Sequence, residues 1–201
     1  ISYRVYGGLS FYQRKEIKDV LAYLRLLINP DDEQAFKRII NFPARGIGQT
    51  TLNKIAVEAK NSSVSDYIFI KDLLKSSEIL NNSTKNKLLD FVIMIESIKN
   101  KIEHADVFDI TKEVLKQSGL YNLYKNDESL EGINRIQNIE ELLNGIKDFV
   151  ENNEKSQASV SSFLQDVALA TDQDNDTNDN NKVSLMTVHL AKGLEFPYVY
   201  I

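Results

Sequence analysis

The sequence predicts a mainly α protein, in which a long block of helices is flanked by short β-strands near the two ends of the chain. Apolar residues recur at helical spacing through most of residues 15–170. The stretches SYRVYGG, VSLMTVHL and FPYVYI are instead rich in β-branched and aromatic residues, which favour strands. Because strands this short need others to pair with, we expect the helices from about residue 30 to 182 to be inserted into a sheet-containing domain.

The first helix is predicted over the stretch KEIKDVLAYLRLLIN and is amphipathic. Its apolar residues recur at helical spacing: Ile17, Val20, Leu21, Leu24, Leu27 and Ile28. The sequence NPDD ends this helix and begins the next, DEQAFKRIINF, because Pro30 disfavours helix at the preceding residue and acids suit a helix N-terminus. After Pro43, a tight turn at residues 46–48 leads into a third helix, which Thr50 or Thr51 caps.

Five further helices are predicted by apolar periodicity, at about 64–76, 84–103, 106–118, 131–152 and 158–170. Gly119 follows one of them as the glycine that ends a helix in the left-handed conformation. The stretch TDQDNDTNDNNK, residues 171–182, contains no apolar residue, so we expect a flexible loop there.

The composition excludes several kinds of site. The chain has no cysteine, which excludes disulfides and cysteine-bound metals and fits a reducing cytoplasm. His104 and His189 are too few for a histidine-rich metal site, and the paired acids are interpreted as helical surface charge, so no metal site is expected. No apolar run of about 18 residues and no signal peptide is visible, so we expect no membrane span. The chain opens at Ile1 and ends in strand-like runs, so we expect it to be part of a longer protein.

The charge is unevenly distributed along the chain. The net charge of −5 argues against a dedicated nucleic-acid binder. Residues 1–60 nevertheless contain ten Lys or Arg and six Asp or Glu, whereas residues 61–182 contain 13 and 22. If a polyanion is bound, we therefore expect it to contact the first 60 residues.

Two groups of residues in this basic region are candidates for contact with phosphate. In R-G-I-G, the glycines let a backbone approach, the following helix presents free N–H groups, and Arg45 and Thr51 add a charge and a hydroxyl. These features are typical of a helix–hairpin–helix contact with duplex DNA. Lys18 and Arg25 project near one another on one side of the first helix. The alternatives are an ordinary turn between helices and a solvated helix face.

The stretch HLAKGLEF is a third candidate site. His189 lies at the end of a predicted strand, where ligands gather in open α/β sheets. Lys192 can neutralise a phosphate, Gly193 permits close approach, and Glu195 can accept hydrogen bonds from ribose hydroxyls. The alternative is a plain connection between strands. His189 has no evident general-base partner, so no catalytic residue is predicted.

Three motifs together resemble those of the UvrD/PcrA/Rep-type superfamily 1A DNA helicases. They are GG-x-x-F-x-x-R-x-E-I-K-D at the start of the chain, R-G-I-G after the second helix and H-x-A-K-G-L-E-F near the end. The stretch SGLYNLYKNDESLEGINRIQNIEELLNGIKDF is similar to the inserted helical region of that family. The resemblance covers nearly all of the chain, in the order of the family.

This resemblance implies a domain organisation and an activity. It implies that residues 1–29 are part of a RecA-like domain 2A, 30–182 form the helical 2B domain, and 183–201 return to 2A with motif V. The RecA-like α/β domain is then incomplete in this chain. Members of the family use ATP with Mg²⁺ to move 3′ to 5′ along single-stranded DNA and to separate duplexes in repair and replication. DNA, as single strand and duplex junction, and repair proteins are the expected partners, in the bacterial cytoplasm at the nucleoid.

The resemblance also implies roles for individual residues. Gly46, Ile47, Gly48 and Thr51 match an element that contacts the duplex backbone, as do the basic residues Lys18 and Arg25. His189 matches a contact with single-stranded DNA, which Lys192 supports, and Glu195 matches a contact with the ATP ribose. Leu190 departs from the serine of many relatives.

The chain lacks other motifs of an ATP-hydrolysing motor. It contains no G-x-x-x-x-G-K-[ST] phosphate loop, no acidic metal-binding motif II and no arginine-bearing motif VI. We therefore expect the chain alone to be inactive and to bind no ATP or Mg²⁺. Two alternatives stay open: a helicase–nuclease subunit, and a 2B domain that acts as a non-enzymatic regulatory or protein-interaction module.

Overall fold

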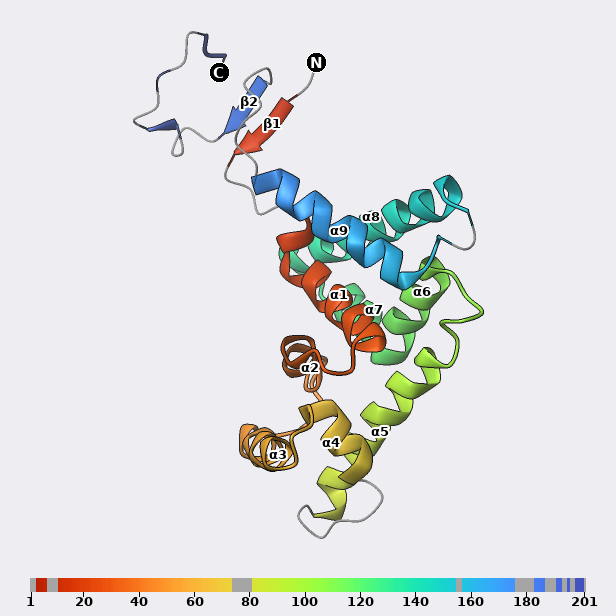
Figure 1. The fold of residues 1–201 in the computed structure, drawn as a ribbon. Coiled ribbons are helices and arrows are strands. Elements are labelled where there is room, and N and C mark those ends of the chain that lie inside the picture. Colours follow the sequence, from red (N-terminus) through yellow and green to blue (C-terminus); the bar gives the residue numbers. More distant parts are fainter. Residues whose placement is uncertain are drawn as a thin grey trace.

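The computed structural model describes residues 3–6, 11–73, 81–154, 157–175, 183–186, 191–192, 195 and 198–200. The elements in these residues are β1 (Tyr3–Tyr6), the 3₁₀ helix η1 (Phe11–Gln13), α1 (Lys15–Ile28), α2 (Glu33–Ile39), α3 (Gln49–Asn61), α4 (Asp66–Leu73), α5 (Asn82–Lys99), α6 (Val107–Ser118), α7 (Leu120–Lys125), α8 (Leu130–Asn152), α9 (Val160–Asn175) and β2 (Val183–Met186). The prediction of a mainly α protein is confirmed (Figure 1).

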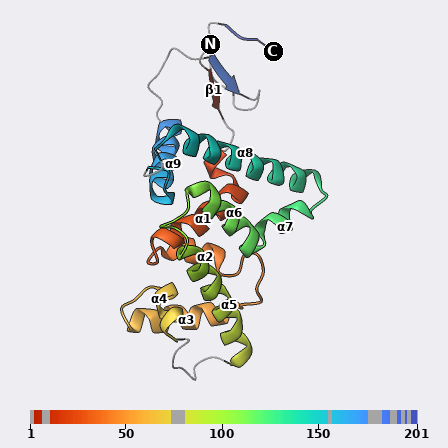
Figure 2. The same cartoon turned by 90° about the vertical axis from the view of Figure 1, so that its right-hand side faces the viewer.

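The two short strands come from opposite ends of the sequence and pair in parallel, from Tyr3 opposite Val183 to Tyr6 opposite Met186. In Figures 1 and 2 this pair lies outside the helical block, beyond the end of the block at which α8 and α9 lie. The prediction of a buried strand at FPYVYI is wrong for residues 198–200, which have no regular structure and are mostly exposed. In the described residues no further strand is present to pair with them, and an unpaired strand is not stable.

Helix α1 is amphipathic, as predicted, and is the central helix of the block. Ten of its 14 residues are buried, including Val20 and Leu24, neither of which is exposed to solvent. It packs against α2, α5, α6, α8 and α9, and Figure 2 shows it enclosed by them. The predicted domain boundary at residue 29 stays a prediction, and α1, on one side of it, packs against helices on the other side.

Two buried carboxylates on α1 bind groups from other helices. Asp19, 2% exposed, accepts hydrogen bonds from Arg38 Nε of α2 at 2.7 Å and from the Tyr124 hydroxyl of α7 at 2.8 Å. Glu16, one turn earlier, accepts from Asn138 Nδ2 of α8. Burial raises the pKa of Tyr124, and the Asp19 carboxylate raises it further, so Tyr124 stays protonated and donates. These contacts fix α2, α7 and α8 against α1.

The helices and their boundaries agree with the predictions except at three places: the start of α3, the short helix α7 and the end of α9. Gly119 ends α6 in the left-handed conformation, with φ 80°, as predicted. Helix α3 begins after Gly48, so Thr50 and Thr51 lie inside its first turn and do not cap it. The short helix α7 was not predicted. Helix α9 continues to Asn175, so the predicted loop at 171–182 is wrong for residues 171–175, and residues 176–182 lie outside the described part.

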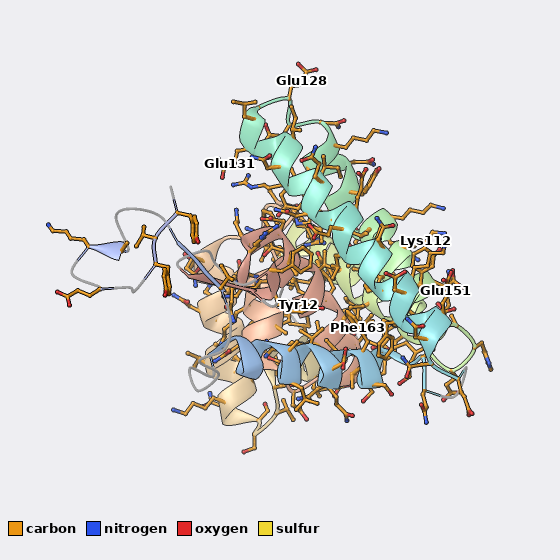
Figure 3. The ribbon with its side chains drawn as sticks, turned by 90° about the horizontal axis from the view of Figure 1, so that it is seen from above. Tyr12, Lys112, Glu128, Glu131, Glu151 and Phe163 are labelled. Atoms are coloured by element: carbon orange, nitrogen blue, oxygen red, sulfur yellow. The ribbon has the colours of Figure 1, made fainter. Side chains whose placement is uncertain are left out.

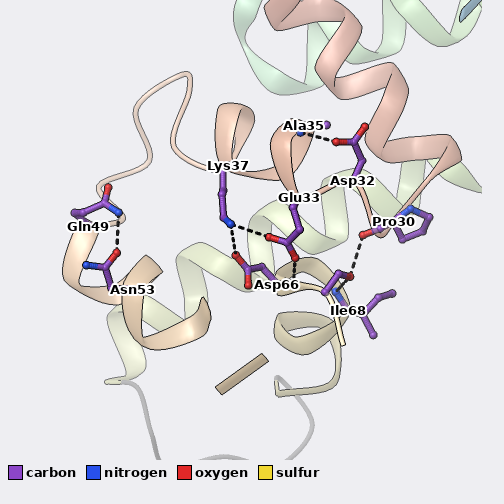
Figure 4. Close-up of polar contacts among 10 residues, drawn as sticks. Pro30, Asp32, Glu33, Ala35, Lys37, Gln49, Asn53, Asp66 and Ile68 are labelled. Carbon is purple, nitrogen blue, oxygen red and sulfur yellow. Dashed lines mark hydrogen bonds and ion pairs between the residues drawn. The ribbon is translucent and has the colours of Figure 1, made fainter. Parts of the chain in front are cut away.

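Helices α2 and α4 are joined by a cluster of charges, which Figure 4 shows. Glu33 Oε1 accepts from the backbone N–H of Asp66 at 2.7 Å, and Lys37 Nζ lies 3.0 Å from Glu33 Oε2 and 3.8 Å from Asp66 Oδ2. The Ser65 hydroxyl donates to the carbonyl of Pro30 at 3.1 Å. Burial raises the pKa of Asp66 to about 6, and the neighbouring Glu33 carboxylate adds to the rise.

Replacing Asp19 with Ala is expected to destabilise the chain strongly, because Arg38 and Tyr124 lose their shared buried acceptor. The free energy of unfolding, measured by urea denaturation, should fall by about 3 kcal/mol or more. Tyr124→Phe removes only one hydrogen bond and should cost about 1 kcal/mol. Equal losses in the two variants would contradict a central role for the Asp19 carboxylate.

The stability of the chain is expected to depend on the ionisation of Asp66. Its pKa of about 6 lies above that of an unfolded aspartate, so its contribution is complete below about pH 4 and is lost as the pH rises through 6. Between pH 5 and 7.5 the free energy of unfolding should fall by about 1 kcal/mol more in the wild type than in Asp66→Asn, which cannot ionise. Parallel pH profiles of the two proteins in urea denaturation would exclude this effect.

Candidate nucleic-acid interface

The candidate DNA-binding loop consists of residues 40–48, which connect α2 to α3. Its shape is set by the Asn41 side chain, whose Oδ1 accepts from the backbone N–H groups of Arg45 at 2.9 Å and Ile47 at 3.2 Å. The Ile47 side chain is 2% exposed and is part of the hydrophobic core. Gly46 and Gly48 on either side of it are exposed. The loop is therefore anchored near its end by Ile47 and presents exposed glycine backbone on both sides of that residue.

The structure requires a glycine at position 46 but not at position 48. Gly46 has a φ of 66°, which L side chains rarely adopt, and a Cβ there would lie 2.8 Å from Lys87 Nζ. Gly48 has an ordinary extended conformation, and a Cβ there would meet nothing within 4 Å. No contact inside the described chain requires glycine at this second position. Its bare backbone leaves room for a ligand to approach.

Helix α3 begins directly at this exposed backbone. No side chain caps it, and in the described chain the N–H groups of Gln49 and Thr50 have no hydrogen-bond acceptor. The Gln49 side chain instead donates to Asn53 Oδ1 at 2.9 Å, along the helix (Figure 4). Thr51 lies in the same turn and is half-buried. Free N–H groups and the positive end of the helix dipole favour an anion at this place.

Arg45 is turned into the protein rather than toward solvent. Its Nη1 donates to three carbonyl oxygens at the end of α2, those of Ile39, Ile40 and Pro43, at 2.7, 3.2 and 3.3 Å. Its Nη2 donates to the Tyr23 hydroxyl at 2.7 Å, and the guanidinium carbon lies 5.1 Å from the centre of the Phe91 ring. This geometry gives Arg45 a role in positioning the loop. The duplex contact assigned to it stays a prediction, which these internal bonds disfavour.

Tyr23 of α1 and Lys87 of α5 also bond to the loop, and neither contact was predicted from the sequence. The Tyr23 hydroxyl donates to the Phe42 carbonyl at 2.8 Å while it accepts from Arg45. Burial raises the pKa of Tyr23, against the opposing effect of Arg45. Lys87 Nζ, from α5, donates to the Gly46 carbonyl at 3.0 Å. Asn41 could have been found from sequence, since Asn is a common turn residue, but no sequence pattern connects Lys87 to Gly46.

Lys18 and Arg25 line a different place, a groove of about 730 Å³ between α1, α2 and α9 that Arg38 and Tyr12 also line. Figure 3 shows Tyr12 near α9, one of the helices that form this groove. Arg25 forms an ion pair with Asp32 at 2.7 Å, whereas in the described chain the Lys18 ammonium has no partner. The structure therefore brings Lys18 and Arg25 together, with one of the two charges already neutralised.

The structure does not bring this basic groove next to the candidate DNA-binding loop. Tyr23, which holds Arg45, is five residues from Lys18 and so lies about 140° around α1 from it. In Figure 2, α9 and the connection from α2 to α3 lie on opposite sides of the block. The duplex-binding residues predicted from sequence thus form two separate groups.

The candidate residues of motif V lie beyond β2. The side chains of Lys192 and Glu195 are exposed. His189 lies outside the described residues, as do Leu190 and Gly193. Among the residues that the structure describes, no group of three His, Asp or Glu could hold a metal ion, and no helix is long and apolar enough to span a membrane.

The chain has relatives among known proteins over its whole length. It is 38% identical over 209 residues to the ATP-dependent DNA helicase PcrA of Bacillus subtilis (strain 168), a match that covers 100% of this chain and 28% of that protein. It is 37% identical over 203 residues to the protein of the same name from Staphylococcus epidermidis (strain ATCC 35984), covering 100% and 27%. For the protein from Staphylococcus aureus (strain Mu50) the identity is 37% over 201 residues, covering 99% and 27%.

The chain thus spans 27 to 28% of the length of these curated relatives. Residues 1–201 also match a family model, that of the UvrD-like helicase C-terminal domain. The chain therefore belongs to the UvrD-like helicase family, within its C-terminal domain.

Proposed function

We propose that this chain is the part of an ATP-dependent DNA helicase that contacts duplex DNA and couples ATP hydrolysis to movement along single-stranded DNA. The observation that carries the proposal is the family match over residues 1–201, together with relatives named ATP-dependent DNA helicase PcrA. The proposed helicase moves 3′ to 5′, separates duplexes in repair or replication, and acts with repair proteins in the bacterial cytoplasm.

In this proposal the two strands and α1 belong to the RecA-like domain 2A and the helices α2 to α9 form domain 2B. The parallel pairing of β1 with β2 supports it, because two strands from opposite ends of the chain meet outside the helical block. The proposed boundary between the two domains stays at residues 29–30. The packing of α1 against α2, α5, α6, α8 and α9 gives the two proposed domains an extensive contact there.

Residues 46–51 are the proposed contact with the duplex backbone. Exposed glycine backbone permits close approach of a phosphate, and the uncapped N-terminus of α3 favours an anion. Thr51 adds a hydroxyl, and Ile47 holds the loop to the core. Lys18 and Arg25 are a second proposed duplex contact on another side of α1, in which Lys18 supplies the unpaired charge.

The residues of motif V are the proposed coupling site. His189 and Lys192 contact the single strand in this proposal, and Glu195 contacts the ribose of ATP. The exposed side chains of Lys192 and Glu195 are available to such ligands. The residues of this chain do not fit a complete site for ATP and Mg²⁺, because the sequence has no phosphate loop and no acidic motif II. The rest of that site must come from residues outside this chain.

A second candidate function is a regulatory or protein-interaction module. It is favoured by the outer side of α8 and the turn before it, which expose many carboxylates: Glu128, Glu131, Glu140, Glu141, Asp148 and Glu151. Figure 3 shows Glu128 and Glu131 near one end of α8 and Glu151 near the other. Such a surface repels DNA and suits a basic protein partner.

The 201-residue chain is expected to bind a duplex with a single-stranded tail, with an affinity that falls steeply with salt because counterions are released. Thr51→Ala should weaken binding by about two- to tenfold through loss of one hydrogen bond. Thr84→Ala on α5 is the matched control and should bind like the wild type. Fluorescence anisotropy across a salt series measures both. No binding at any salt would favour the interaction module.

The purified chain is expected to release no phosphate from ATP, with or without DNA, because the groups that position the phosphates are missing from its sequence. A phosphate-release assay checks this, with a full-length relative such as PcrA of Bacillus subtilis as the positive control. ATP hydrolysis that copurifies with the chain, at a rate proportional to the chain's concentration, would overturn the expectation.

A further inference from the structure

The candidate DNA-binding loop needs a cation that faces its ligand, and Arg45 is not placed to supply it. Four hydrogen bonds direct its guanidinium to carbonyls of the chain and to Tyr23, and the Phe91 ring covers it. Any cation that neutralises a phosphate at this loop must therefore come from another residue.

Lys87 brings a charge to Gly46, in a hollow that it lines together with Arg45 and Phe91. Its ammonium lies 3.0 Å from the Gly46 carbonyl in an exposed contact, which occupies one of its three donors. Lys37, Lys71, Lys101 and Lys147 each pair with a glutamate, whereas Lys87 forms no ion pair in the described part of the chain. Asp90 lines the same hollow as Lys87 but lies beyond ion-pair distance.

One turn of α5 contacts two successive residues of the loop. Phe91, 1% exposed, lies against the Arg45 guanidinium, and Lys87, four residues earlier, contacts Gly46. The neighbouring Leu88 is fully buried, so this turn of α5 is fixed in the core. A side chain at position 46 would displace the ammonium, because its Cβ would lie 2.8 Å from Nζ. The absence of a side chain at Gly46 thus keeps Lys87 on the loop.

We infer that Lys87 is the residue that neutralises the DNA phosphate bound at this loop, and that Arg45 is a positioning residue. The inference rests on the proposed duplex contact at residues 46–51. It assigns the phosphate contact to α5, an element that contains none of the motifs of the sequence. An ammonium on a flexible stem suits this role, because it remains on the loop and still presents donors to a ligand.

The test compares single-residue variants of the chain in binding to tailed duplex DNA across a salt series. Lys87→Gln should reduce the slope of log K against log salt by about 0.9, which makes binding about eightfold weaker at 0.1 M salt and unchanged at 1 M. Lys87→Arg should restore the slope. Lys85→Gln removes the same charge from another face of α5 and should leave the slope unchanged. Arg45→Gln should instead lower the thermal midpoint, which Lys87→Gln leaves unchanged.

The outcomes separate the inference from the function on which it rests. If Thr51→Ala weakens binding while Lys87→Gln keeps the wild-type affinity and slope, the inference is wrong and the duplex contact stands. If Lys87→Gln and Lys85→Gln reduce the slope equally, the charge acts at long range and the assignment also fails. If the wild type binds no duplex at any salt, both the proposed contact and the inference are overturned.

Discussion

The carboxylate of Asp19 lies in the interior of the helical block, where an ionised group is tolerated only if it is fully hydrogen-bonded. Its two donors, Arg38 and Tyr124, come from two other helices. Satisfying one buried charge therefore fixes α2 and α7 against α1. The surrounding apolar side chains supply most of the stabilisation, but apolar burial is non-directional. The position of each helix along α1 depends on these directional contacts.

The side of α1 that carries Asp19 also contacts the candidate DNA-binding loop, through Tyr23. Tyr23 lies one helical turn after Asp19, and its hydroxyl joins α1 to Arg45 and to the end of α2. Phe91 of α5 covers the Arg45 guanidinium from another side. Arg45 is thus held by contacts with two core helices, while Gly46 and Gly48 are exposed and Lys87 contacts the Gly46 carbonyl. A loop built in this way keeps its shape when its outer surface contacts a ligand.

Most helices could be predicted from the sequence, because a long apolar stripe at helical spacing is a local property. The prediction failed where structure depends on contacts outside the segment. Helix α7 has only six residues, and its buried Leu120 and Tyr124 are too few to make a periodic pattern. Residues 198–200 have a strand-like composition, but a strand also needs a partner. The packing of α1 against helices distant in sequence could likewise not be read from its own apolar pattern.

The amino-acid sequence by itself determined the helical class, the left-handed end of α6 at Gly119 and the resemblance to UvrD-like helicases. These depend on residues close together or on the spacing within motifs. Only the tertiary structure decided which cation of the loop is held by four hydrogen bonds and which makes a single hydrogen bond to Gly46. Arg45 is bonded to a hydroxyl 22 residues away and Gly46 to an ammonium 41 residues away. Contacts at such separations form when helices pack, and no local pattern encodes them.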